Sequence, residues 1–193
     1  MDANIFRGSL IRLTAEDPQN LSQAYARWLR DSECMRLQDS YPARPLSERQ
    51  LKEWMERDLE KDDPSQLPFS VRTLADDRLI GDIGLMDIRW SHGDAFVGIA
   101  IDERELWGKG YGTDAMRVML RYSFIELNLH RISLNVFGYN PRAIRSYEKC
   151  GFVKEGTVRK ALHREGQYWD VIYMGILKEE WERTASAGGS KDE

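Results

Sequence analysis

The sequence predicts an α/β domain built on a mixed, twisted sheet. Hydrophobic residues recur with a period near two in several runs and at helical spacing in others. A strand, a helix and another strand also follow one another over residues 95–137, and such a crossover joins parallel strands. A chain of 193 residues falls within the size range of one domain.

Helical spacing and capping signals define the expected helices, which cover residues 18–30, 47–61, 113–126 and 141–149. Ser47 suits the N-cap of the second helix, and Asn140 before Pro141 suits the start of the last, because Pro is pre-set for the first helical turn. Two prolines over residues 41–45 predict a loop between the first two helices.

The expected strands have the shorter period and are bounded by turn residues. They cover residues 69–74, 79–88, 95–101, 131–137, 152–158 and 168–177, and the first three of them form an antiparallel meander. From Thr184 onward, small and charged residues predict a flexible C-terminal tail over residues 184–193, after a folded domain of residues 1–183.

Composition excludes several classes of partner. A net charge of -4 without a Lys/Arg cluster argues against nucleic acid. The chain shows neither a leader nor a run of eighteen apolar residues, so we expect a cytoplasmic protein without a membrane partner. Cys34 and Cys150 are expected to be plain thiols, and the three single histidines predict no metal site.

A glycine-rich stretch predicts an anion-binding loop at the start of a helix. It consists of Trp107, Gly108, Lys109, Gly110, Tyr111, Gly112 and Thr113. Alternating glycines let backbone N–H groups turn toward one anion, and the helix dipole adds positive potential. A dinucleotide fingerprint needs an acidic residue at the end of the next strand, and a Walker loop needs Ser or Thr after Gly-Lys. Neither requirement is met.

A second motif follows on the helix at residues 141–149. Asn140, Ala143 and Tyr147 lie near one face of it, because offsets of three, four and seven residues bring side chains together. Asn140 and Tyr147 can therefore address one ligand, although capping and packing alone would also explain them.

The two motifs together resemble the GNAT superfamily of N-acetyltransferases. The second reads Asn-x-x-Ala-x-x-x-Tyr-x-x-x-Gly-Phe from Asn140 to Phe152, and Trp107 replaces the usual Gln or Arg of the loop. Tryptophan there resembles the branch that contains ribosomal-protein N-terminal acetyltransferases and spermidine acetyltransferases. The resemblance implies acetyl-CoA as co-substrate and about seven strands. Residues 5–13 would form the first strand, and the fourth and fifth strands would splay apart.

The resemblance also implies roles for individual residues. A bulge in residues 97–101 would let the backbone of Ile99, Ala100 and Ile101 contact the cofactor, and Tyr147 would be the general acid. Many relatives place a glutamate base where this chain has Phe96. The substitutes are Asp82, Asp87 and His92, of which we assign Asp87, and a water chain is a further alternative.

The acceptor is expected to be a primary amine. In the family the acceptor side is covered by the region that here contains Trp28, Asp31, Glu33 and Tyr41, and late strands bring Trp169 and Asp170 to it. Acidic and aromatic side chains suit a cationic amine. The branch favours a peptide N-terminus, with polyamines and antibiotics as alternatives. A non-catalytic acyl-CoA-binding module and a nicotinamide enzyme are rival readings, and the sequence leaves open a homodimer.

Overall fold

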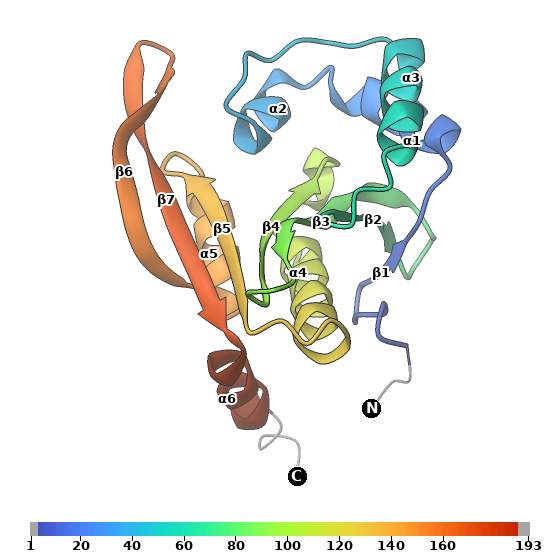
Figure 1. Cartoon of the computed structure of the whole chain (residues 1–193). Coiled ribbons are helices and arrows are strands. Elements are labelled where there is room, and N and C mark those ends of the chain that lie inside the picture. Colours follow the sequence, from blue (N-terminus) through green and yellow to red (C-terminus); the bar gives the residue numbers. More distant parts are fainter. Residues whose placement is uncertain (1–3, 189–193) are drawn as a thin grey trace.

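The computed structural model describes residues 4–188 and contains a seven-stranded mixed sheet in the order β1-β2-β3-β4-β5-β7-β6 (Figure 1). The strands are β1 (Ile11–Thr14), β2 (Leu67–Thr73), β3 (Leu79–Arg89), β4 (Asp94–Ile101), β5 (Arg131–Phe137), β6 (Val153–Arg164) and β7 (Gln167–Leu177). The helices are α1 (Pro18–Trp28), α2 (Ser32–Gln38), α3 (Glu48–Leu59), α4 (Tyr111–Arg121), α5 (Pro141–Lys149) and α6 (Lys178–Gly188). The prediction of a mixed α/β fold is confirmed.

The sheet combines the predicted meander with the predicted crossover. Strands β1 to β4 pair antiparallel with their sequence neighbours, whereas β4 and β5 pair in parallel across α4. Strand β7 then inserts between β5 and β6. This order leaves β4 and β5 as the parallel pair at the centre of the sheet.

Helices α1, α2 and α3 gather at one end of the sheet (Figure 1). Asp17 caps α1, and Ser47 forms a capping box with Gln50 at the start of α3, so sequence signals locate both starts. Helix α2 is absent from the sequence prediction. It has only seven residues and depends on Asp31, whose carboxylate accepts the N–H groups of Glu33 and Cys34.

Helices α4 and α5 lie behind the strands in Figure 1. Helix α4 contacts β1, β3 and β4 and also packs against α5. Met116, Met119 and Leu120 of α4 are fully buried in the core. The helix continues into a π-helical turn, Tyr122–Glu126, so the predicted end near residue 126 agrees with the structure. Burial of its apolar face against the sheet positions the start of α4 beside the end of β4.

Strand β1 is shorter than the expected first strand, because the residues before it turn back on β1 itself: Arg7 forms an isolated antiparallel bridge with Arg12, and the N–H of Leu13 donates to the carbonyl of Phe6. The carboxylate of Asp114 on α4 accepts the N–H groups of Ser9, Leu10 and Ile11 at 2.7 to 3.1 Å. These backbone donors are therefore satisfied by a side chain distant in sequence, which a local pattern does not reveal.

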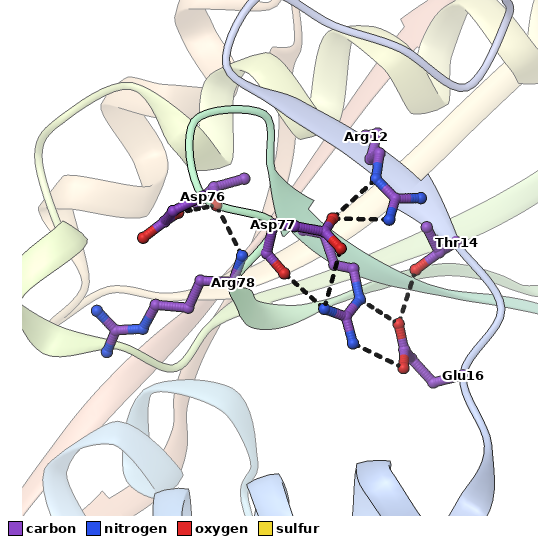
Figure 2. Close-up of polar contacts among 8 residues, drawn as sticks. Arg12, Thr14, Glu16, Asp76, Asp77 and Arg78 are labelled. Carbon is purple, nitrogen blue, oxygen red and sulfur yellow. Dashed lines mark hydrogen bonds and ion pairs between the residues drawn. The ribbon is translucent and has the colours of Figure 1, made fainter.

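Charged residues fasten β1 to the turn between β2 and β3 (Figure 2). Arg12 pairs with Asp77 at 2.7 Å, and the guanidinium of Arg72 donates two hydrogen bonds to Glu16 at 2.5 and 3.0 Å. Thr14 donates to the same Glu16 carboxylate. This network holds a four-residue edge strand in register.

The C-terminal region is a long hairpin followed by α6 (Figure 1). Strand β6 extends to Arg164, beyond the predicted end at residue 158, because it pairs with β7 through two register shifts. Residues 184–188, predicted as the start of the tail, are the end of α6, and residues 189–193 lie outside the described residues. Trp181 anchors α6 against Phe124, with ring centroids 5.4 Å apart.

Candidate active site

A cleft opens where β4 and β5 diverge. The two strands pair only between Asp94–Phe96 and Arg131–Ser133, so from Val97 onward β4 has no partner strand on that side. The cleft has a volume of about 530 Å³ and lies between β4, β5, α2, the N-terminal part of α4 and the length of α5. Backbone N–H and C=O groups on the free side of β4 are available to an extended ligand.

Most residues expected to hold the cofactor line this cleft. They are Ile99, Ala100, Ile101, Trp107, Gly108, Gly110, Tyr111, Gly112, Thr113, Asn140, Ala143 and Tyr147. Lys109 belongs to the same loop but does not contribute to the cleft wall. The fold thus brings together two motifs that are separated in the chain by all of β5.

The bulge expected in residues 97–101 is not present in this described strand. Phe96 lies opposite Met86 and Ile101 opposite Gly81, in unbroken register, and the shift in this strand pair lies between Met86 and Arg89 of β3. A bulge is not required to expose the backbone of β4, because the divergence of β5 already leaves one side of it unpaired.

The glycine-rich loop turns tightly into α4. Gly108 and Gly110 have φ angles of 76° and 94°, which residues with a Cβ rarely adopt. Gly110 is the N-cap of α4, and the first N–H groups of any α-helix have no acceptor within the helix. Gly112 lies outside the left-handed region, and a Cβ added there would sit 3.5 Å from Cγ1 of Ile101. The loop therefore directs N–H donors and the positive end of the helix dipole to the cleft.

Trp107 fixes the base of this loop and holds a cation above it. Its indole N–H donates to the carbonyl of Ile101 at 2.6 Å. The Cζ atoms of Arg142 and Arg104 lie 3.5 and 5.2 Å from the ring centroid, which is cation–π geometry. Burial lowers the pKa of Arg142, but a guanidinium remains charged at neutral pH. Trp107, in the position of the usual Gln or Arg, thus places Arg142 at the cleft.

Asn140 and the start of α5 form the opposite wall. The side-chain oxygen of Asn140 accepts the N–H of Ala143 at 3.2 Å, so Asn140 caps the helix as well as lining the cleft. The hydroxyls of Thr113 and Ser146 are 2.8 Å apart, and the thiol of Cys150 donates to the carbonyl of Thr113. These contacts set the first turn of α4 against the second half of α5.

Tyr147 lies on the cleft side of α5, with its ring 6.1 Å from that of Phe152. Its hydroxyl has no hydrogen-bond partner among residues 4–188. Burial, reinforced by Cys150 and opposed by Arg142, raises the pKa of Tyr147 to about 12. The phenol is therefore protonated at neutral pH and has a proton to donate.

The first helices do not bring their expected acceptor residues to the cleft wall. Trp28 is buried, and its indole donates to Glu103 at 2.9 Å. Asp31 caps α2 and pairs with Arg104 at 2.7 Å, and Glu33 binds the same guanidinium. Asp31 and Glu33 therefore connect α2 with Arg104.

Tyr41, Trp169 and Asp170 also lie outside the wall of the cleft. Tyr41 is 75% exposed. The ring of Trp169 packs edge-on against Tyr139, and Asp170 accepts the N–H of Lys160 at 2.9 Å. Their contacts belong to the hairpin and its neighbours.

The base candidates are also displaced from the cleft. Asp87 is exposed, has a φ of 51° at the irregular part of β3, and does not line the cleft. His92 is exposed in the turn before β4. Asp82 accepts the hydroxyl of Tyr25 at 2.7 Å, and burial raises the pKa of Asp82 to about 6.

The structure adds a carboxylate that the sequence analysis did not single out, Asp102 at the end of β4. Asp102 is 9% exposed, and its Oδ1 accepts Nε2 of Gln38 at 2.6 Å and the thiol of Cys34 at 3.5 Å. Its Oδ2 has no partner among the described residues. Burial, together with the charge of Asp82, raises the pKa of Asp102 to about 7. An aspartate after a strand carries no signal of such burial.

A further part of the cleft wall consists of residues that the sequence analysis did not place there, apart from Phe96, which it named as replacing a glutamate. Helix α2 contributes Cys34, Leu37 and Gln38, and the strands contribute Met86 and Phe96. Among the described residues, no aspartate or glutamate lines the cleft. Its charged lining residues are the cations Arg142, Arg145 and Lys149 of α5. Helical spacing from Ala143 and Tyr147 does not indicate these positions, because none of them lies three or four residues from either.

Two general expectations concern ions and membranes. Within residues 4–188, no three His, Cys, Asp or Glu side chains are grouped so that they could bind a metal ion. No helix in the same part of the chain has the length and apolar character of a membrane span. Cys34 and Cys150 are free thiols, as predicted.

Residues 9–153 match the family model described as "Acetyltransferase (GNAT) domain", a stretch that includes both cleft motifs. The N-acetyltransferase YokL of Bacillus subtilis, named as prophage-derived and uncharacterized, is 34% identical over 79% of this chain and 82% of that protein. The spermidine N(1)-acetyltransferase of Vibrio cholerae is 40% identical over 55% of this chain and 61% of that protein. A crystal structure of spermidine N-acetyltransferase from Vibrio cholerae, in complex with CoA and spermine, has a TM-score of 0.78 and 30% identity, covering 89% of this chain and 98% of that chain.

Proposed function

The chain belongs to the GNAT acetyltransferase family and is an N-acetyltransferase, and on this premise we propose that it acetylates the α-amine of a polypeptide by direct attack on acetyl-CoA. The observation that carries the proposal is the arrangement of one cleft. The glycine-rich loop, the unpaired side of β4 and the phenol of Tyr147 all line it.

The residues present fit an acyl-CoA. The N–H donors of residues 108–113 suit the pyrophosphate, and positive φ at Gly108 and Gly110 lets the backbone approach it. The free side of β4 suits the amides of the pantetheine arm, as an added strand would. The absence of carboxylates from the described lining removes a source of repulsion for the phosphates.

Tyr147 would protonate the departing thiolate. Its hydroxyl lacks a protein partner among the described residues and is protonated at neutral pH, because its pKa is about 12. The raised pKa also makes this phenol a weaker acid than one in water, so burial does not assist the donation itself. The phenolate left behind can be reprotonated from solvent after product release. This role needs the hydroxyl and not only the ring.

The missing base favours an acceptor that loses its proton easily. Phe96 occupies the position of the usual glutamate, and no carboxylate is among the described lining residues. An alkylamine with a pKa of about 10.4 costs about 4 to 5 kcal/mol to deprotonate at pH 7, whereas an α-amine with a pKa of about 7.7 to 8.0 costs about 1 kcal/mol. An α-amine therefore suits a site that relies on water as proton acceptor.

The part of the cleft wall formed by α2, β3 and β4 also suits a peptide. Leu37, Met86 and Phe96 are apolar, and a polycation would find no described carboxylate among the lining residues. Polyamines are the second candidate, because the relatives include spermidine acetyltransferases.

An acceptor panel tests the proposal. Thiol release from acetyl-CoA would be measured with peptides of different first residues, spermidine and an aminoglycoside, and we expect the highest kcat/KM for a peptide with a small or apolar first residue. A higher kcat/KM for spermidine than for every peptide would contradict the assignment. In the matched variant Phe96→Glu, the added carboxylate should raise kcat/KM for spermidine relative to the peptides.

A further inference from the structure

We propose that Arg145 and Lys149 of α5 bind the 3′-phosphate of the acyl-CoA. The proposal rests on the proposed function, because it requires acetyl-CoA in the cleft. It assigns a specificity role to side chains that neither sequence motif contains.

Both side chains are placed for this role by helical spacing. Arg145 and Lys149 are four residues apart on one face of α5, about 6 Å along the helix axis, and both line the cleft. Their neighbours Ser146 and Cys150 contact Thr113 in the first turn of α4. The two cations therefore flank the anion-binding start of α4.

Neither cation is engaged by a carboxylate. Among residues 4–188, no acidic side chain lies within ion-pair distance of Arg145 or Lys149, although Glu148 is exposed on the same helix. Arg104, Arg72 and other arginines of the chain do have such partners. A phosphate could bind Arg145 and Lys149 without first breaking an ion pair.

The charge of the cofactor requires a second binding element. Coenzyme A carries a phosphomonoester on its ribose in addition to the pyrophosphate. Backbone N–H groups and a helix dipole supply about half a unit charge at the start of α4, which the pyrophosphate would already use. A guanidinium and an ammonium together match a doubly charged phosphomonoester. Arg142 is not part of this pair, because its guanidinium is stacked on Trp107.

Calorimetry with two ligands tests the assignment on the full chain. CoA and 3′-dephospho-CoA differ only in the phosphomonoester, so they separate its binding from that of the pyrophosphate. In Arg145→Gln/Lys149→Gln we expect the Kd for CoA to rise about ten-fold or more, since each ten-fold change is about 1.4 kcal/mol and charge-assisted hydrogen bonds contribute on that scale. The Kd for 3′-dephospho-CoA should change by less than about two-fold.

The matched control is Arg159→Gln/Lys154→Gln, which removes the same net charge from exposed positions of β6 outside the cleft wall. It should bind both ligands as the unmodified chain does, and Arg145→Lys should retain most of the CoA affinity. Equal loss for both ligands, or no loss for either, would overturn the phosphomonoester assignment alone. If the unmodified chain bound neither ligand, the acetyl-CoA proposal itself would fail.

Discussion

Tyr147 illustrates how the fold keeps a single side chain protonated inside the cleft. An exposed phenol with a pKa of about 10 would also be protonated at neutral pH. At an exposed site, however, water molecules could protonate the thiolate in its place. Within the cleft, desolvation raises the pKa of Tyr147 to about 12 and the hydroxyl keeps no protein partner among the described residues. The role depends on one oxygen atom, so it can be tested without disturbing the ring.

Tyr147→Phe should lower kcat with little change in acetyl-CoA affinity. General acid catalysis contributes about 10²- to 10⁴-fold, and the loss should lie near the lower end because a thiol of pKa about 8.5 leaves more easily than an alcohol. Steady-state kinetics, calorimetry and thermal unfolding would separate these effects. Tyr168→Phe, at an exposed position of β7, is the control. Parallel losses of binding and melting temperature would instead assign Tyr147 to packing.

At the same scale, the sequence predicts the residues whose position follows from local chemistry. Asn140, Ala143 and Tyr147 share a face because α5 begins at a cap that the sequence displays. Asp102 and Arg142 were not predicted, because their environment depends on contacts with α2 and Trp107. Burial of an aspartate and stacking of an arginine are properties of the folded chain.

At the scale of elements, two glycines at the start of α4 have different roles. Gly110 is required by the backbone conformation, whereas Gly112 leaves room for a ligand beside the helix. Gly110 needs its positive φ, so any substitution there strains the turn. Gly112 lies in ordinary backbone, and an added Cβ would make normal contact with Ile101. Gly112 is therefore the better position for testing the anion site.

Gly112→Asp should abolish measurable acetyl-CoA binding, because it sets a carboxylate among the N–H donors that would hold the pyrophosphate. Gly112→Ala is the matched control and should retain binding within about ten-fold, since its methyl group fits and adds no charge. Calorimetry on both variants, with circular dichroism to confirm folding, makes the comparison. Equal affinities in the two variants would show that this loop does not hold the cofactor.

Elements differ in how well the sequence predicts them. The bounds of β5 and α5 agree with the sequence prediction to the residue, because β-rich composition and an Asn-Pro start define them. Helices α2 and α6 were missed because distant partners hold them. Arg104 pairs with the cap of α2, and Phe124 receives Trp181 of α6. The turn before β1 is a further case, since the carboxylate of Asp114 accepts the N–H groups of Ser9 and Leu10 there.

At the scale of the whole molecule, folding lowers the pKa of one carboxylate and raises the pKa of two others. Arg72 lowers the pKa of Glu16 at the edge of the sheet. Burial raises the pKa of Asp82 to about 6 and that of Asp102 to about 7 between α1, α2 and the central strands. Both groups of carboxylates would titrate near pH 4 in the unfolded chain. In the pH range between the folded and unfolded pKa values, folding therefore releases protons from Glu16 and takes up protons at Asp82 and Asp102.

The free energy of unfolding should consequently pass through a maximum in mildly acidic solution. Below about pH 4, Glu16 becomes protonated and its contribution to stability is lost as pH falls. Between about pH 4 and 7, the folded chain binds more protons than the unfolded chain at Asp82 and Asp102, so the free energy of unfolding decreases as pH rises. Once the pH is well above the raised pKa of Asp102, about 7, Asp82 and Asp102 are ionised in both the folded and the unfolded chain, and this decrease ends.

Asp102→Asn tests the decrease in the free energy of unfolding that is expected as pH rises through the raised pKa of Asp102. The amide keeps an oxygen that can accept Nε2 of Gln38 but has no charge to desolvate, so the variant should gain stability at pH 8 relative to pH 5. Urea unfolding at several pH values would measure the free energy of unfolding. Asp87→Asn removes an exposed carboxylate and should leave the slope between pH 5 and 8 unchanged. An Asp102→Asn variant with the slope of the unmodified chain would contradict the raised pKa of Asp102, and the carboxylate would then be ionised throughout this range.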